Sequence, residues 1–475
     1  MRAVTGFSRL ILILILGILM LVSCAPFQPE RIPDASGPLP GTFAVYNAAV
    51  DVTLPWWPSL GSPELNRLID EALSGSFTLK ESWARLRQTE ALAIQAGAER
   101  FPAVTASGSA ESTRGRTRTT SNTSLWRESY LLALAGSYEL DFWGRIRSAQ
   151  EAALLDVSAS RADLQTAAMT LTATVADRWL QILSLKRQEK LLREQLQSSQ
   201  TFLELIELRF RKAMVSALDV YQQKQVVENI RAKIPLIEAE TRLLEHELAV
   251  LIGRPPRADL ELTQAQMPTI GPLPAVGLPA DLLAHRPDVR AAGLHLRAAG
   301  WQVAEARANR LPKLQLGADL QYGPNELDLF FDTWLISLAA NLTAPIFDGG
   351  RLAAAVDLTR AQEDENLWAY RQAVLTAVKE VEDALESEAR QREHIHGLAA
   401  VMEAARRGFE EAVQRYRRGL SDYLPVLTQL IAVQDLEQNL IQQQETLIRY
   451  RIALHRALGG DWHGMTEPMV PKDQG

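Results

Sequence analysis

The 475-residue chain has one cysteine, Cys24, so it cannot form an internal disulfide. Basic residues are not in excess: 50 lysines and arginines face 57 aspartates and glutamates, and the net charge of −7 argues against nucleic-acid binding. The chain has no P-loop and no nucleophile elbow, and His394 and His396 would face different sides of a helix. We therefore expect no enzymatic activity, no metal site and no cofactor apart from a covalent lipid.

The N-terminus has the pattern of a secretory signal. Arg2 and Arg9 precede the apolar run 10–22, which is shorter than the roughly 20 residues that a membrane-spanning helix needs. The sequence LVSC ending at Cys24 resembles a bacterial lipobox, which implies cleavage before Cys24 and attachment of lipid (palmitate) to this residue. We therefore expect a signal peptide at 1–23 and a lipid-anchored segment at 24–62. The segment at 24–62 should be extended, because proline is frequent in it.

Glycine and proline are absent from a long part of the chain. Neither occurs between positions 145 and 212, and one helix over this range would be about 100 Å long at 1.5 Å per residue. A short break follows at 209–221, RFRKAMVSALDVY, and a similar break occurs at 415–427, RYRRGLSDYLPVL. The two breaks start 206 positions apart (415 − 209), so we expect one architectural unit to occur twice.

Period-two alternation precedes each long helix. We expect strands at about 103–112 and 129–141 in the first unit, and at about 313–323 and 333–346 in the second. Strands of this length with one apolar face match a membrane barrel, and a soluble half-buried hairpin fits the same pattern. Four strands cannot close a barrel in lipid, so a membrane reading requires oligomerisation.

These elements predict a duplicated organisation. The first repeat is expected at 63–253, with a helical hairpin at about 145–253. A proline-rich linker at 254–279 separates it from the second repeat at 280–460, whose hairpin lies at about 350–459. A tail at 461–475 follows.

The order of these motifs resembles the TolC-type outer-membrane efflux proteins, in particular their NodT-type lipoprotein branch. The matching stretches are LVSC at 21–24, YELDFWGRIR at 138–147, LPADLLAHRPDVRAAGLHLRAA at 278–299, RLPKLQLGA at 310–318, PIFDGGR at 345–351 and GLSDYLPVL at 419–427.

The resemblance implies a mainly α fold with β, in which a homotrimer forms a 12-stranded β-barrel continuous with a periplasmic α-helical barrel. It further implies a passive exit duct in the cell outer membrane. Its partners would be outer-membrane lipid, a periplasmic adaptor (membrane fusion) protein and an inner-membrane pump of the resistance-nodulation-division type. The alternative is a lipid-anchored periplasmic coiled-coil scaffold without a membrane barrel.

The resemblance also assigns roles to the two breaks. It implies a periplasmic gate in which Asp219 ties to Tyr416, with Asp422 nearby. Some relatives have aspartates where this chain has Pro425 and Thr428, so the gate's negative charge should come chiefly from Asp219. Asp219 could instead serve only to cap the returning helix.

The tips of the hairpins are expected to dock the adaptor. Ala213 replaces the turn glycine that is present as Gly419, which suggests a different turn in the first tip. The residues expected to dock are Met214, Val215, Ser216, Gly419, Leu420 and Ser421.

One helix face near position 380 is rich in acidic residues. It is interpreted either as a solvated face or as a cation-selective lining. The residues concerned are Glu380, Glu382, Asp383, Glu386 and Glu388.

Overall fold

The computed structural model describes residues 27–30, 35–43, 56–118, 122–274, 279–323 and 334–460. The predicted signal peptide, Cys24 and the C-terminal tail lie outside these described residues. The chain divides into two compact units, and several long helices run through both. Unit 1 contains residues 1–35, 85–161 and 291–371; unit 2 contains 36–84, 162–290 and 372–475.

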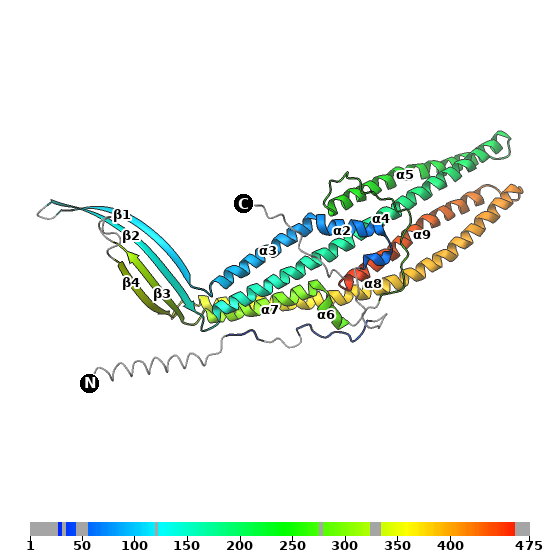
Figure 1. Cartoon of the computed structure of the whole chain (residues 1–475). Helices are drawn as coiled ribbons and strands as arrows, with labels where there is room; N and C mark the ends of the chain where they lie inside the picture. The colour runs from blue at the N-terminus through cyan, green and yellow to red at the C-terminus, as the bar shows by residue number, and fades with distance from the viewer. Residues whose placement is uncertain are drawn as a thin grey trace. The chain divides into compact units, whose positions relative to one another are not determined.

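Unit 1 contains one four-stranded antiparallel sheet with the order β1-β2-β3-β4 (Figure 1). The two hairpins join in the middle, where Leu140 of β2 pairs with Leu314 of β3. Within the described residues, β1 and β4 each pair with one strand and are therefore the edges of the sheet. The strands are β1 (Ala103–Arg118), β2 (Asn122–Leu140), β3 (Lys313–Tyr322) and β4 (Trp334–Thr343).

The first hairpin is longer than its alternation predicted. Its ladder continues from the Glu111–Ser129 pair to the Arg118–Asn122 pair, through residues that lie outside the predicted strands at 103–112 and 129–141. Backbone hydrogen bonds hold an antiparallel ladder together, so polar side chains need not end it. The apolar pattern marks only the part of a strand that has an apolar face.

The turns from the sheet into the long helices use aspartate side chains. The Asp141 carboxylate accepts hydrogen bonds from the backbone N–H groups of Ile146 (3.1 Å) and Arg147 (2.8 Å). Asp348 likewise accepts from the backbone of Gly350 (3.0 Å) and Leu352 (2.9 Å). Each aspartate satisfies N–H groups that have no partner inside the first helical turn, so both long helices start at a defined residue.

The longest helices are α4 and α8, each of 67 residues. None of the helices in the described ranges is both long and apolar enough to cross a membrane. The helices that run through or within unit 1 are α3 (Phe77–Ala98), α4 (Arg145–Arg211), α7 (Pro287–Ala308) and α8 (Arg351–Arg417).

Unit 2 contains the two returning helices, α5 (Ala217–Leu251) and α9 (Leu424–Ala457), which form hairpins with α4 and α8 (Figure 1). A short helix, α2 (Pro63–Gly75), buries Leu65, Leu68, Ile69 and Ala72 completely. The remaining short elements are η1 (Trp57–Leu60), η2 (Pro279–Asp281) and α6 (Leu282–His285).

The acidic face of α8 is neither a uniformly solvated surface nor a row of free carboxylates. Glu388 is fully buried and binds Arg451 of α9 at 2.6 and 2.9 Å. Burial opposes ionisation of Glu388, but the hydrogen bonds and charges of Arg451 and Arg392 hold its pKa below the usual value. Glu380 accepts from buried Arg286 at 2.7 Å. Neither interpretation therefore holds for buried Glu388, and partly exposed Glu380 is already paired with Arg286.

Arg451 also fastens the linker between the repeats. Its guanidinium donates to the carbonyls of Pro272 (2.8 Å) and Gly271 (3.3 Å). The buried cation thus has a carboxylate and two backbone acceptors, which is the condition for a buried charge to be tolerated. This part of the linker is consequently held against α8 and α9.

The pH dependence of stability should reflect His455 of α9. Its imidazole stacks on the indole of Trp56 with ring centroids 5.5 Å apart. Burial, aided by the charge of Arg451, lowers the pKa of His455 to about 4. The unfolded chain, with a histidine pKa of about 6.5, binds this proton more readily. This stabilisation is present above about pH 6.5 and is lost as the pH falls towards 4.

We predict that His455→Phe, which keeps a ring against Trp56, flattens this dependence. The stabilisation that His455 loses between pH 7 and pH 4 is on the order of 3 kcal/mol. Thermal unfolding followed by circular dichroism at pH 7 and pH 4.5 should show a larger drop in midpoint for wild type than for His455→Phe. Equal drops would contradict the assignment.

Candidate functional site

The two hairpin tips share one backbone conformation. In the first tip, the N–H of Met214 donates to the carbonyl of Arg209 (2.9 Å), and the N–H of Ala213 donates to Phe210 (2.8 Å). In the second tip, Leu420 donates to Arg415 (2.9 Å) and Gly419 to Tyr416 (3.0 Å). These i to i−5 and i to i−3 bonds define a Schellman cap at the end of each outgoing helix.

The prediction of a different turn in the first tip is wrong. Ala213 has φ of 56° and Gly419 has φ of 73°, so both lie in the left-handed region. The same cap therefore forms with alanine, which is strained there by its Cβ. The hydrogen bonds that the carbonyls at the helix end accept therefore outweigh this local strain.

A capping box starts α5 after the first tip. The Ser216 side chain accepts from the N–H of Asp219 (3.3 Å), and the Asp219 carboxylate accepts from the N–H and the hydroxyl of Ser216 (both 2.9 Å). Ser216 is thus the N-cap residue and Asp219 its reciprocal partner. The structure gives Asp219 a capping role, while its gate role stays a prediction.

The second tip is built around two tyrosines. The rings of Tyr416 and Tyr423 lie 5.5 Å apart, and the Arg209 guanidinium lies 4.5 Å from the Tyr416 ring centre. The hydroxyl of Tyr423 donates to the Gln223 side chain of α5 at 2.6 Å. The buried hydroxyl of Tyr416 has no hydrogen-bond partner among the described residues, so the predicted bond from Asp219 to Tyr416 is absent in this conformation.

Tyr423 and Gln223 therefore link the two hairpins where sequence reasoning expected Asp219 and Tyr416. Burial is the main cause of the raised pKa of Tyr423, and the nearby Tyr416 and Asp219 add to it. The phenol remains a neutral hydrogen-bond donor at ordinary pH. Tyr423 stands within the matched stretch at 419–427, whereas nothing in the pattern distinguishes Gln223 from other helical glutamines.

An apolar cluster supports both tips. It combines side chains from the first hairpin and from the second, and Val215 packs against it together with Phe409. Its buried members are Leu192, Ile206, Val226, Ile230, Ile234, Ala412, Tyr416, Tyr423, Val426 and Leu427.

The predicted docking residues differ in exposure. Met214 and Leu420 are 61% and 64% exposed, and Val215 is partly buried. Ser216, Gly419 and Asp422 are exposed, and Ser421 is partly buried. The side chains that protrude are therefore Met214 and Leu420, which occupy equivalent positions in the two repeats.

A polar seam of buried amides follows the apolar cluster along α4 and α9. Gln195 donates to the carbonyl of Gln434 (3.2 Å) and accepts from Gln438 (3.0 Å). Gln434 donates to the hydroxyl of Ser199 (3.1 Å), whose carbonyl accepts from Gln223 (2.8 Å). Buried amides need such partners, so the seam fixes the register of one hairpin against the other.

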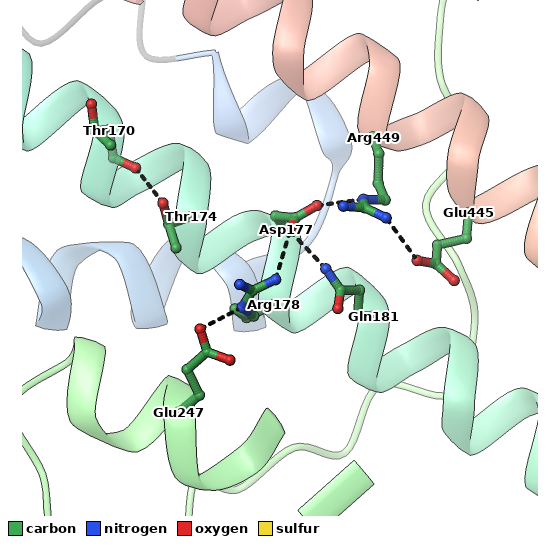
Figure 2. Close-up of polar contacts among 8 residues, drawn as sticks. All are labelled: Thr170, Thr174, Asp177, Arg178, Gln181, Glu247, Glu445 and Arg449. Carbon is green, nitrogen blue, oxygen red and sulfur yellow. Dashed lines mark hydrogen bonds and ion pairs between the residues drawn. The ribbon is translucent and has the colours of Figure 1, made fainter. Parts of the chain in front are cut away.

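Farther along the same helices, charged groups replace the amides (Figure 2). Asp177 of α4 accepts from Arg449 of α9 (2.6 Å), from Arg178 (3.1 Å) and from Gln181 (2.7 Å). Arg178 also binds Glu247 of α5 at 2.7 Å. This network connects α5, α4 and α9. No group of three or more His, Cys, Asp or Glu in the described part of the chain could hold a metal ion.

The sequence profile described as "Outer membrane efflux protein" matches residues 68–254 and 278–460, which are the two repeats. The chain belongs to the outer membrane efflux protein family. The efflux protein is therefore an outer-membrane component of an efflux pump, and the scaffold alternative is not supported. Its family has a transport role.

Relatives of the efflux protein match it over most of its length. Pyoverdine export outer membrane protein OpmQ of Pseudomonas putida is 36% identical over 413 residues, covering 86% of this chain and 88% of the relative. Outer membrane protein OprJ of Pseudomonas aeruginosa is 30% identical over 467 residues, 96% of each chain. The solved structure of the outer-membrane channel OprN has a TM-score of 0.82 at 28% identity, covering 92% of this chain and 98% of OprN.

Ala213 offers a test of the tip geometry in the efflux protein. We predict that Ala213→Gly stabilises the first tip by about 0.5 kcal/mol, because relief of left-handed strain exceeds the extra entropy of glycine in the unfolded chain. The matched change Gly419→Ala should destabilise the second tip. Amide hydrogen exchange of the tip peptides would measure both, and slower exchange in Gly419→Ala would contradict the assignment.

Proposed function

We propose that this efflux protein is the exit duct of a tripartite system, passively conducting substrates from an inner-membrane pump and periplasmic adaptor across the periplasm and outer membrane. The observation that carries the proposal is the four-stranded sheet with two edge strands, joined to helices of 67 residues. Such helices are long enough to reach about 100 Å.

A homotrimer would supply the missing strand partners. Unpaired backbone groups at β1 and β4 cannot be left in hydrocarbon, so β1 of one copy pairs with β4 of the next in this proposal. Three copies of four strands give a 12-stranded barrel. Exposed apolar side chains on β4, including Leu338 and Leu342, support contact with lipid.

Cys24 is proposed as the lipid-anchoring residue of a NodT-type lipoprotein. Support comes from the lipobox-like sequence that ends at this residue and from the absence of a second cysteine in the chain. The pump would be of the resistance-nodulation-division type. OpmQ is named for pyoverdine export, and another relative from Pseudomonas putida is named as the outer membrane protein of a toluene efflux pump, so selection would lie with the pump.

The hairpin tips are proposed to act as gate and docking surface. The gate residues are Asp219, Tyr416 and Asp422, to which the geometry adds the link from Tyr423 to Gln223. Opening would separate the two hairpins at this point. Met214 and Leu420, exposed beside the gate, would contact the adaptor.

The gate can be tested by single-channel conductance in planar bilayers. We predict that purified wild-type protein conducts weakly in its resting state and that Asp219→Ala raises this conductance severalfold. Ser216→Ala is the matched control, because it removes the same cap, worth about 1 kcal/mol, but keeps the carboxylate. An equal rise in both variants, or no rise in Asp219→Ala, would overturn the gate role.

Docking can be tested by cysteine cross-linking in cells that contain a candidate adaptor and pump. We predict that Met214→Cys and Leu420→Cys cross-link to the adaptor. Leu243→Cys, on α5 and 66% exposed, should not, because it lies away from the tips. Cross-links from Leu243→Cys alone would place the docking surface elsewhere.

A further inference from the structure

A cavity of about 460 Å³ lies between α4 and α9 in unit 2. Its charged lining residues are Asp177, Arg178, Arg449 and Arg456, the first three of which are drawn in Figure 2, and Thr174 and Thr446 add two hydroxyl groups. The rest of the lining is apolar or aromatic, with Ala173, Tyr450 and Ala453 among its members. The cavity thus combines several guanidinium groups with a surface on which an organic group could pack.

The carboxylate of Asp177, which lines the cavity, is engaged in three hydrogen bonds from other side chains of the protein. It accepts from Arg449, Arg178 and Gln181 at 2.6, 3.1 and 2.7 Å. Arg178 uses Nη1 for Asp177 and Nε for Glu247, and Arg449 uses Nε for Asp177. A guanidinium has five N–H donors, so both arginines retain donors beyond these bonds.

Other carboxylates near the cavity are already engaged. Glu247 accepts from Arg178 at 2.7 Å, and Glu445 lies 3.9 Å from Arg449. Burial raises the pKa of Glu445, which weakens its competition for that guanidinium. Glu380 lies 3.7 Å from Arg456, beyond hydrogen-bond distance, and accepts from Arg286 at 2.7 Å. Arg456, 42% exposed, is therefore the least neutralised cation of the lining.

We propose that this cavity binds a small organic anion. Its carboxylate, phosphate or sulfate group would accept hydrogen bonds from Arg456 and Arg449, whose planar guanidinium groups suit such oxyanions. The aliphatic or aromatic part of the ligand would lie against Tyr450, Ala173 and Ala453. An uncharged compound of the same shape would lack partners for the guanidinium groups.

The opposite face of the helix pair is covered by other elements. Trp179, two positions and therefore about 200° around α4 from Asp177, donates to Glu64 of α2 at 2.7 Å. On α9, Arg451 holds the linker and His455 stacks on Trp56. Resting on the proposed function, we infer that the face left uncovered by the described residues is the inner wall of the duct, where the cavity would hold an anionic substrate in transit.

The test uses the full-length protein in detergent and two fluorescent probes, dansylglycine with a carboxylate and dansylamide without one. Wild type should bind dansylglycine more tightly than dansylamide. Arg456→Gln should weaken dansylglycine binding about threefold to fivefold, as expected for a half-exposed ion pair, and Arg456→Lys should restore part of it. Arg231→Gln, an exposed arginine of α5, is the matched control and should bind as wild type does.

Equal affinity for the two probes, or unchanged dansylglycine binding in Arg456→Gln, would overturn the proposal. Thermal unfolding would establish that the variants are folded, which is expected because Arg456 has one long ion pair. Channel conductance separates the two proposals. A conducting protein that fails to discriminate the probes refutes only the anion site, and a non-conducting protein that discriminates them refutes only the duct.

Discussion

Packing of hairpin α4–α5 against hairpin α8–α9 is the interaction on which unit 2 depends. Helices of this length are stabilised mainly by burying one face against a neighbour. The contact changes in character along its length: apolar at the tips, amide in the middle and charged around Asp177 and Arg449. Apolar contacts tolerate some sliding, whereas hydrogen bonds need a particular partner at a particular distance. The polar parts therefore fix the register that brings Tyr423 to Gln223.

The duplication preserved backbone geometry more strictly than side-chain chemistry. Both tips use the same Schellman cap, even where alanine must adopt a left-handed conformation. The entry to the returning helix differs, since Ser216 and Asp219 cap α5, while Tyr423 precedes α9 without a side-chain cap. Asp219 is thus held in a capping box in one tip, whereas Tyr416 and Tyr423 pack together in the other, so a gate made from both would be chemically asymmetric within a single chain.

Arginine serves two purposes in unit 2. Arg286 and Arg451 are buried, and each meets carboxylate and backbone oxygens that compensate for its lost hydration. These two residues hold the linker and the helix ends in place. Three other arginines line a cavity instead: Arg178, Arg449 and Arg456. Their carboxylate partners do not engage all of their guanidinium N–H groups. The difference lies in how completely each guanidinium is satisfied, which the residue type alone does not reveal.

The sequence by itself determined the long helices, the duplication at a spacing of 206 positions and the family, because these depend on local periodicity and on the order of motifs. The absence of glycine and proline between positions 145 and 212 predicted the extent of α4 for the same reason. Only the tertiary structure decided that Glu388 is buried against Arg451, and that Tyr423 rather than Tyr416 bonds across the tips. These contacts join residues 63 and 200 positions apart. Such pairings depend on how two hairpins align side by side, and no local pattern in either hairpin encodes that alignment.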